Sequence, residues 1–295
     1  GAASRIGAMF KTKSSKDSGV PFLKGHGAGN DFVVLDATSG GVNPGSKAVE
    51  VLCDRRKGIG ADGVLRIAPA SEFQVSDAKY FMDYRNADGS LGMTCGNGLR
   101  VTARFLVENG YEKNGSFTIG TRAGTVTAFV AEADKNFENI AIEMGKFDPI
   151  EDELTVTTET GSWQASGINS PNPHAVTIVG NIWDAGSLGD VPSVSPSSSF
   201  PDGVNVEFVE PKSPTHIAMR THERGVGETL ACGSGSCAAA LVWATKNELE
   251  TGWSVQVDLL GGTVFVDQSA DGTLTLRGPA AFVASGTISP QLWQG

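Results

Sequence analysis

The sequence has few cysteines and few histidines, and this shortage excludes two kinds of protein. Its 295 residues include four histidines and four cysteines, Cys53, Cys95, Cys232 and Cys237. No Cys-x-x-Cys pair and no nearby histidine pair occurs, so a structural zinc site is not expected. A secreted scaffold held together by disulfides would be shorter and richer in cysteine. Reduced thiols in a cytoplasmic protein without a bound metal fit these residues best.

Long apolar runs and an excess of positive charge are also missing. No apolar run reaches the about eighteen residues that a membrane-spanning helix needs. A net charge of −10 and an isoelectric point near 4.9 argue against a nucleic-acid-binding protein. The hydrophobic content of 40% is that of an ordinary globular protein, and the length suffices for two domains.

The N-terminal residues differ in composition from the rest of the chain. Residues 1–18 are rich in Gly, Ala, Ser and Lys and lack the continuous apolar segment of a secretory signal. We expect them to be a disordered tail or to include a remnant of the expression vector, with Met9 as a candidate native start.

Two similar motifs lie about half a chain apart. Cys95 begins Cys-Gly-Asn-Gly and Cys232 begins Cys-Gly-Ser-Gly, each after an acidic loop broken by glycine and before a run typical of a helix. An offset of 137 residues (232 − 95) also aligns Gly98 with Gly235. The repeat predicts two halves of one architecture, each with a thiol at the start of a helix.

A thiol in this position has a chemical consequence. Unpaired N–H groups and the partial positive charge at a helix start favour the thiolate, so we expect both cysteines to be acidic. Glycines after each cysteine allow backbone N–H groups to approach an anion. A single such cysteine could be a small buried side chain, but two in matching contexts make that interpretation weak. We predict burial without a catalytic role for Cys53 and Cys237.

The rest of the chain reads as short strands separated by turns, with one main helix in each half. This pattern predicts an α+β fold with a sheet wrapped around a central helix. The Pro/Ser-rich residues 190–203 are predicted to be a loop. The basic residues 55–57 end a short predicted helix over residues 46–56, and we expect them to complement the helix dipole and to be solvated.

Three further polar positions are candidates for a site, each with a structural alternative. His26, Asn30 and Asp31 lie among glycines, which suit either a ligand or a tight strand connection. His174 follows a Pro-Asn-Pro sequence, and it could take part in acid–base tuning of a site or cap the end of a strand. Asn205 lies in an apolar strand, where its amide needs a ligand or a backbone partner.

Several motifs together resemble those of the diaminopimelate epimerase family: HGAGNDF, CDRRKGIGADG, YRNADGS with CGNG, NPH, NVEF and ERGVGETLACGSGSCAAA, in this order. The resemblance begins at about Phe22 and extends to the last strands. Pro171 departs from it, because the family more usually has glycine there. The resemblance implies a cofactor-independent amino-acid epimerase of lysine and peptidoglycan biosynthesis. It also implies a cytoplasmic homodimer that acts on a small molecule, diaminopimelate, and has neither nucleic-acid nor membrane partners.

The same resemblance implies two similar α+β domains, each a mainly antiparallel sheet or barrel around a central helix. We assign residues 20–145 and 279–293 to an N-terminal domain that carries Cys95. Residues 146–278 then form a C-terminal domain that carries Cys232.

The resemblance also assigns roles to individual residues. Cys95 and Cys232 are the implied catalytic pair, one as thiolate and one as thiol, which fits the need for a base and an acid on opposite faces of an α-carbon. His174 and Glu223 are the implied tuners of their acidity. The implied substrate-binding residues are Asn30, Asn86, Gly96, Asn97, Asn172, Asn205, Glu223, Arg224, Gly233 and Ser234.

Three alternatives remain open at this point. A two-cysteine racemase related to proline racemase would use the same chemistry on another substrate. A thiol–disulfide redox or sensor protein would link Cys95 to Cys232, although no Cys-x-x-Cys motif supports it. A non-catalytic amino-acid-binding protein would keep the asparagines and Arg224 but would not need two cysteines.

Overall fold

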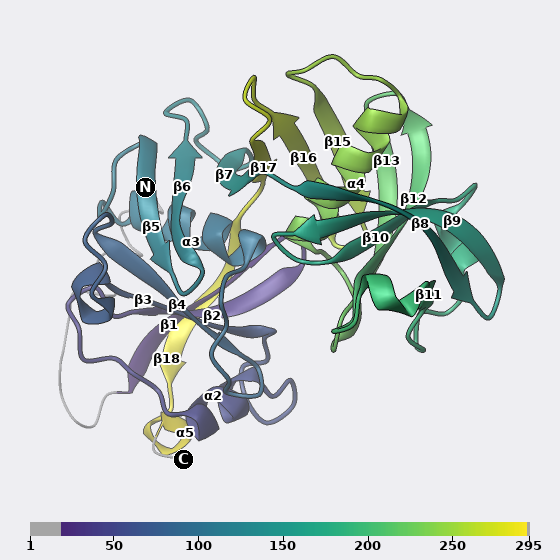
Figure 1. Ribbon diagram of the computed structural model, residues 1–295. Helices are drawn as coiled ribbons and strands as arrows, with labels where there is room; N and C mark the ends of the chain where they lie inside the picture. The colour runs from purple at the N-terminus through teal and green to yellow at the C-terminus, as the bar shows by residue number, and fades with distance from the viewer. Residues whose placement is uncertain (1–18, 294–295) are drawn as a thin grey trace. The chain divides into compact units, whose positions relative to one another are not determined.

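A computed structural model describes residues 19–293, so the tail predicted at residues 1–18 lies outside the described residues. The chain divides into two compact units (Figure 1). Unit 1 holds the described residues up to Ile142 and those from Pro279 onward, and unit 2 is Glu143–Gly278. Each unit is described separately below.

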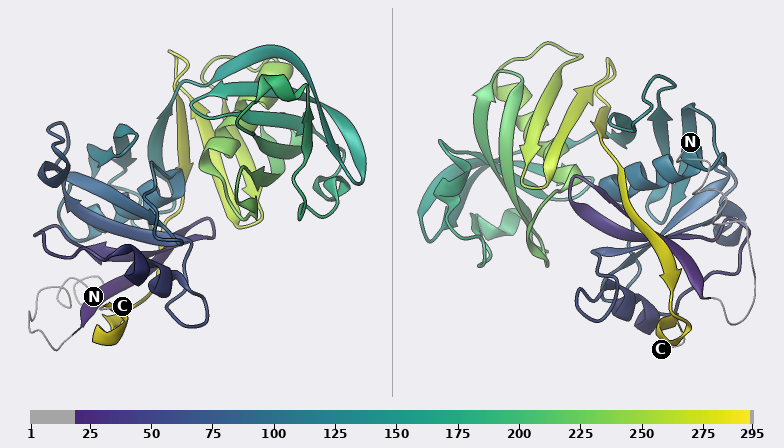
Figure 2. Two further views of the ribbon diagram at one scale, coloured as in Figure 1. Left: turned by 60° about the horizontal axis from the view of Figure 1, so that its bottom comes forward. Right: turned by 180° about the vertical axis from the view of Figure 1, so that it is seen from behind.

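Unit 1 is a sheet with one long helix. Its strand order is β18–β1–β2–β3–β4–β5–β6–β7, and β18 from the C-terminal end pairs with β1 (Figure 2). The elements are β1 (Val20–Gly27), β2 (Asn30–Asp36), α2 (Ser46–Cys53), β3 (Gly63–Pro69), η1 (Ala70–Phe73), β4 (Tyr80–Asn86), α3 (Gly96–Glu108), β5 (Gly115–Thr121), β6 (Gly124–Val130), β7 (Ile140–Gly145, whose residues from Glu143 onward belong to unit 2), β18 (Ala281–Ile288) and α5 (Pro290–Trp293).

Unit 2 repeats this plan. Its strand order is β11–β8–β9–β10–β12–β13–β15–β16–β17, with β14 also paired to β13. The elements are β8 (Asp148–Thr158), β9 (Gly161–Ser170), β10 (His174–Ile178), η2 (Ile182–Ala185), β11 (Ser193–Ser195), η3 (Ser197–Ser199), β12 (Asn205–Ser213), β13 (His216–Glu223), β14 (Gly227–Thr229), α4 (Gly233–Lys246), β15 (Ser254–Leu259), β16 (Gly262–Gln268) and β17 (Leu274–Gly278).

The two units share strand direction as well as order. In unit 1 the pairs β2–β3 and β4–β5 are parallel, and their counterparts β10–β12 and β13–β15 in unit 2 are parallel too. The other neighbouring pairs in the shared order are antiparallel. This repeat confirms the predicted fold class: two pseudo-symmetric α+β halves, each with mainly antiparallel strands around one helix.

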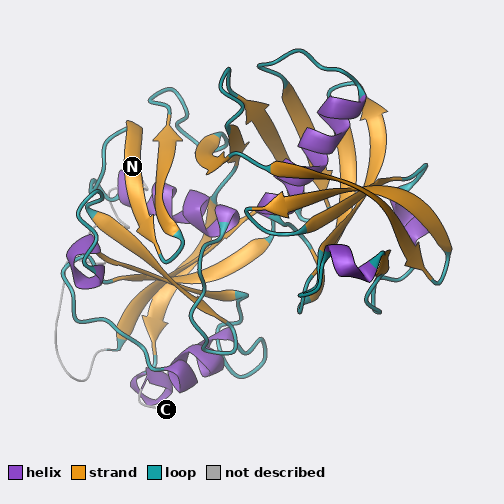
Figure 3. Cartoon of the chain, viewed as in Figure 1, coloured by secondary structure: helices purple, strands orange, loops and turns teal. Residues whose placement is uncertain are grey.

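The central helices suit their surroundings. Helix α4 contacts β10, β12, β13, β15, β16 and β17. Figure 3 shows the helices and strands of both units in different colours. Four small residues of α4 are completely buried: Cys237, Ala238, Ala239 and Ala240. Small side chains allow the strands to approach the helix closely. Among residues 19–293, no helix has both the length and the apolar character needed to cross a membrane.

Strands β9 and β11 of unit 2 lie outside the predicted strands. Strand β9 has few apolar residues, yet backbone hydrogen bonds to β8 and β10 hold it in the sheet. Strand β11 lies inside the predicted loop at residues 190–203 and pairs with β8. In both cases the neighbouring strands determine the conformation, because the local side-chain pattern is too weak to indicate it.

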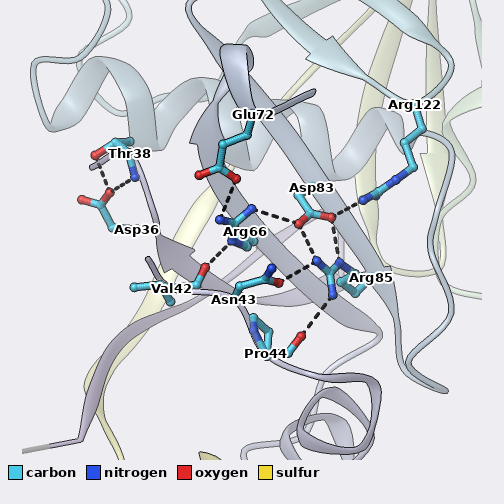
Figure 4. Close-up of polar contacts among 10 residues, drawn as sticks. All are labelled: Asp36, Thr38, Val42, Asn43, Pro44, Arg66, Glu72, Asp83, Arg85 and Arg122. Carbon is cyan, nitrogen blue, oxygen red and sulfur yellow. Dashed lines mark hydrogen bonds and ion pairs between the residues drawn. The ribbon is translucent and has the colours of Figure 1, made fainter. Parts of the chain in front are cut away.

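A buried ion-pair cluster joins the strands of unit 1 (Figure 4). Asp83 on β4 is completely buried and contacts three guanidinium groups: Arg122 at 2.6 Å, Arg85 at 2.7 Å and Arg66 at 3.3 Å. Arg66 also pairs with Glu72 at 2.8 Å. Burial alone would raise the pKa of Asp83, but hydrogen bonds from Arg85 and Arg122 hold this pKa below its ordinary value.

Candidate active site

Both predicted thiols lie at the start of a helix. Cys95 is the N-cap of α3, and its Sγ accepts a hydrogen bond from the backbone N–H of Gly98 at 3.4 Å. Cys232 is the N-cap of α4, where the N–H of Gly235 donates to its Sγ at 3.3 Å. The prediction of a thiol at each helix start is therefore confirmed, and all four cysteines are reduced.

The glycine three residues after each cysteine leaves space for a neighbouring side chain. A Cβ added at Gly98 would lie 3.3 Å from Leu65 Cδ2. A Cβ added at Gly235 would lie only 2.6 Å from Glu207 Oε1 and 3.1 Å from Cys232 Sγ. At Gly235 the absence of a side chain is thus a steric requirement of the site.

In unit 1, two predicted asparagines gather at Cys95. The Sγ of Cys95 donates to Asn30 Oδ1 at 3.4 Å, and Asn97 Nδ2 donates to the same oxygen at 3.1 Å. The amide nitrogen of Asn30 donates to Asp62 Oδ2 at 2.7 Å. Because a carboxylate only accepts, Asp62 determines which end of the Asn30 amide faces the thiol.

Asp62 is held in turn by an ion-pair cluster. Arg55 pairs with Asp31 through two 2.8 Å hydrogen bonds and with Asp62 at 3.1 Å, and Lys24 lies 3.0 Å from Asp31. Partial burial opposes ionisation of Asp31, but Arg55 and Lys24 together hold the pKa of its carboxyl well below the ordinary value. Arg55 is exposed, as predicted, but the fold also brings two carboxylates to it, which the sequence did not indicate.

In unit 2, a chain of polar contacts leads from the thiol of Cys232 into the core. Ser234 Oγ lies 3.8 Å from Cys232 Sγ and accepts from Asn172 Nδ2 at 3.2 Å. Asn172 Oδ1 lies 3.1 Å from His174 Nε2, and His174 Nδ1 lies 2.8 Å from Glu207 Oε1. His174 and Glu207 are both completely buried.

The surroundings of Cys232 oppose ionisation of its thiol. Burial raises the pKa of Cys232 well above its ordinary value, and the carboxylates of Glu223 and Glu207 raise it further. Hydrogen bonds from Gly235 N–H and Ser234 lower this pKa without cancelling the increase. The prediction of an acidic thiol at each helix start is therefore wrong for Cys232, because burial and two nearby carboxylates outweigh the helix start.

Glu223 lies at the end of β13, among the same groups. Burial raises its pKa above the ordinary value, and the negative charge of Glu207 adds to this effect. The side chains of Thr229 and Cys232 act in the opposite direction, as does His174. Glu223 and Cys232 therefore interact directly, and a charge change on one alters the proton affinity of the other.

We expect replacing Glu223 by glutamine to lower the pH at which Cys232 ionises. Removing a neighbouring negative charge stabilises the thiolate relative to the thiol, so the pKa of Cys232 falls. Thiolate absorbance followed during a pH titration, with the Cys232→Ser titration subtracted, measures this change. Glu210→Gln is the matched control, because Glu210 interacts with Ile182 N and Lys212 instead. An unchanged or raised ionisation midpoint in Glu223→Gln would contradict the assignment.

The side-chain amide of Asn205 has two backbone partners. Its Nδ2 donates to Pro173 O at 3.0 Å, and its Oδ1 accepts from Arg224 N at 2.8 Å. Asn205 thereby ties the loop before β10 to the turn after β13. The guanidinium of Arg224 is exposed and contacts only the carbonyl of Asp202 at 3.3 Å among the described residues.

The remaining predicted residues lie at element boundaries. Asn86 ends β4 and donates to Ser90 Oγ at 3.1 Å. The first residues of α3 and α4 are Gly96 with Asn97 and Gly233 with Ser234. Cys53 and Cys237 are buried, as predicted. No group of three or more possible metal ligands occurs within residues 19–293.

Two residues of the site, Asp62 and Glu207, were not predicted from the sequence. Glu207 lies two residues after Asn205 on β12, and this spacing places both side chains on one face of a strand. That spacing was a usable signal. Asp62 offered none, because only the fold brings its loop to Asn30.

Solved structures share this fold across nearly the whole chain. A hydroxyproline epimerase from Agrobacterium vitis matches with a TM-score of 0.64 at 16% identity, covering 92% of each chain. A phenazine biosynthesis protein of the PhzF family from Bacillus anthracis matches with a TM-score of 0.65 at 16% identity, covering 91% of this chain and 98% of that one. The chain therefore shares its fold with this epimerase and this PhzF-family protein.

Sequence comparison places the chain more narrowly. Residues 22–149 and 167–283 match the family described as diaminopimelate epimerase. The diaminopimelate epimerase of Streptomyces coelicolor is 40% identical over 286 residues, 94% of this chain and 98% of that protein. That of Corynebacterium glutamicum is 39% identical over 275 residues, 91% and 98% of the two chains. The chain belongs to the diaminopimelate epimerase family and is an isomerase.

Proposed function

We propose that this protein interconverts LL- and meso-2,6-diaminopimelate without a cofactor, using Cys95 and Cys232 as its two acid–base groups. The observation that carries the proposal is the pair of thiols, each capping the helix at the same place in a repeated fold. Family membership and the names of the relatives support the substrate. The reaction serves lysine and peptidoglycan precursor synthesis in the cytoplasm, and the enzyme is a homodimer.

The proposed reaction is a proton removal followed by a proton return. One thiolate takes the α-hydrogen as a proton, and the electron pair of the C–H bond spreads onto the neighbouring carboxylate. The other cysteine, as a thiol, gives a proton to the opposite face, which inverts the carbon. Because burial and two carboxylates raise the pKa of Cys232, we assign it the thiol role in the resting protein. Cys95 is then the base, and it first releases to solvent the proton that it donates to Asn30 Oδ1.

Backbone N–H groups at the two helix starts are suited to the charge that develops. Gly96 and Asn97 begin α3, and Gly233 and Ser234 begin α4. Such N–H groups bind carboxylates and stabilise the negative charge of the transition state. Arg224 is exposed, and its guanidinium can pair with a carboxylate through two hydrogen bonds.

The remaining assignments of the proposal follow the same family membership. His174 and Glu223 tune the pKa of the thiols. The residues proposed to bind substrate together with Arg224 are Asn30, Asn86, Asn172, Asn205 and Glu223. We assign residues 20–145 with 279–293 and residues 146–278 to the two epimerase domains.

Solvent deuterium incorporation tests this function. Incubation in D2O with LL-diaminopimelate and no added cofactor is expected to place deuterium at one α-carbon while the meso isomer forms. Mass spectrometry measures the incorporated deuterium, and chiral separation measures the meso isomer. The same protein incubated with L-proline is the control for a racemase of the related kind. Exchange with proline but not with diaminopimelate, under reducing conditions, would reject the proposed substrate.

A further inference from the structure

The buried pair of His174 and Glu207 is the starting observation. Both side chains are completely inaccessible, and Nδ1 of the ring lies 2.8 Å from Oε1 of the carboxylate. The other carboxylate oxygen, Oε2, has no hydrogen-bond partner in the described part of the chain. Burying an ionisable pair with one oxygen unsatisfied costs stability, so the fold alone gives no reason for it.

The other unit shows what the fold accepts at the position of His174. In the parallel pair β10–β12, His174 lies opposite Asn205. In the equivalent pair β2–β3, Phe32 lies opposite Gly63. Phe32 therefore occupies in unit 1 the position of His174, and it is completely buried as well.

The same comparison applies to Glu207. It lies two residues after Asn205, and Leu65 lies two residues after Gly63. The glycines of the helix starts support the match, because a Cβ at Gly98 would meet Leu65 whereas a Cβ at Gly235 would meet Glu207. The repeated framework thus packs with an apolar pair in one unit and an ionisable pair in the other.

The ionisable pair leads directly to the reactive thiol. From His174 the polar contacts continue through Asn172 and Ser234 to Cys232. The titratable groups around the ring are Glu207 on β12, Glu223 at the end of β13 and Cys232 at the start of α4. A carboxylate beside Nδ1 favours a proton on that nitrogen, and Nε2 then faces Asn172 Oδ1.

We propose that Glu207 is a positioning residue of the reaction: it holds the Nδ1–H of His174 and so directs Nε2 toward the Asn172–Ser234–Cys232 chain. When Nε2 also carries a proton, Asn172 Oδ1 accepts it, and the ring becomes a cation balanced by Glu207. This cation offsets the negative charge that appears when Cys232 ionises. The expected effect on the reaction rate rests on the proposed function. The location of the proton on the His174 ring does not depend on it.

Nitrogen NMR of the histidine rings tests the location of the proton without substrate. In protein labelled with 15N-histidine, the His174 signals are identified by their absence in His174→Gln. We expect a protonated Nδ1 in the wild-type protein and an unchanged pattern in Glu210→Gln, the control on the same strand. A wild-type ring protonated only on Nε2 would overturn the proposal, whether or not any variant folds.

A double-mutant cycle tests the kinetic role, using the residues of unit 1 as replacements. Glu207→Leu and His174→Phe are each expected to lower kcat about 10²-fold. The double variant is expected to lose about the same 10² rather than 10⁴, because residues that act through one another are not additive. Glu207→Gln keeps an acceptor for Nδ1–H and is expected to recover part of the loss.

The outcomes separate the possible failures. Losses that multiply in the double variant would overturn the positioning role, since a merely structural Glu207 would act independently of His174. Equal KM values with reduced kcat would support it. A wild-type protein that is inactive on diaminopimelate, yet carries the proton on Nδ1, would reject the proposed function and support the assigned geometry of the pair.

Discussion

Replacing either Cys95 or Cys232 by serine is expected to lower the rate of α-hydrogen exchange by at least about 10³-fold. A serine hydroxyl has nearly the size of a thiol but is far less acidic, so at neutral pH it supplies no useful base. Because the proposed reaction needs one cysteine to remove a proton and the other to return one, either replacement interrupts it. Deuterium incorporation into diaminopimelate, measured with each variant, gives the two rates.

The control for this experiment lies on the same helix as Cys232. Cys237 is completely buried and lies between small residues of α4, so Cys237→Ala leaves a very small cavity. We expect this variant to keep activity within about twofold of the wild type and to unfold at a similar temperature. If one of the two serine variants kept wild-type activity while remaining folded, the two-thiol mechanism would be wrong.

Replacing Asp83 by asparagine is expected to have the largest effect on stability. The substitution leaves Arg66, Arg85 and Arg122 beside a neutral amide in a buried cluster. Breaking a buried ion pair by removing one partner costs about 3–5 kcal/mol. At about 2–4 °C per kcal/mol for a chain of this size, the melting temperature should fall by roughly 10 °C.

Calorimetry with a matched surface variant checks this expectation. Asp267 also pairs with an arginine, Arg277 at 2.9 Å, but its side chain is one-third exposed. Asp267→Asn should therefore cost no more than about 1 kcal/mol. Equal losses for Asp83→Asn and Asp267→Asn would show that burial does not strengthen the Asp83 cluster.

The pH dependence of stability gives a second test of Asp83. Its pKa is lowered in the folded protein, so its contribution is complete above the unfolded value of about 3.9 and is lost as the pH falls through the folded value. The stability difference between wild type and Asp83→Asn should therefore shrink on acidification below about pH 4. A difference that stays constant through this range would contradict the lowered pKa.

The sequence was informative where a short stretch contains its own physical cause. Cys95 and Cys232 were predicted at helix starts because each precedes glycines and a helical run, and the caps confirm this. The burial of Cys237 follows from its neighbours on the same helix. These predictions needed no partner from elsewhere in the chain.

Other features required groups that are distant in the chain. Arg55 is exposed, as predicted, but it also pairs with Asp31 on β2 and with Asp62 in the loop before β3. The helix start made Cys232 look acidic, whereas burial, together with Glu223 and Glu207 on different strands, raises its pKa. Strand β9 has a weak pattern and exists because β8 and β10 pair with it.

By itself, the sequence determined the repeat, the two thiol-capped helices and the family, because these depend on residue type at short spacing. Only the tertiary structure decided the charge around the thiols. In unit 1 the strand positions beneath the helix start hold Phe32 and Leu65, and in unit 2 they hold His174 and Glu207. Burial and charges a few ångströms away determine whether a cysteine is a thiol or a thiolate. Strand pairing brings those charges together from separate segments of the chain.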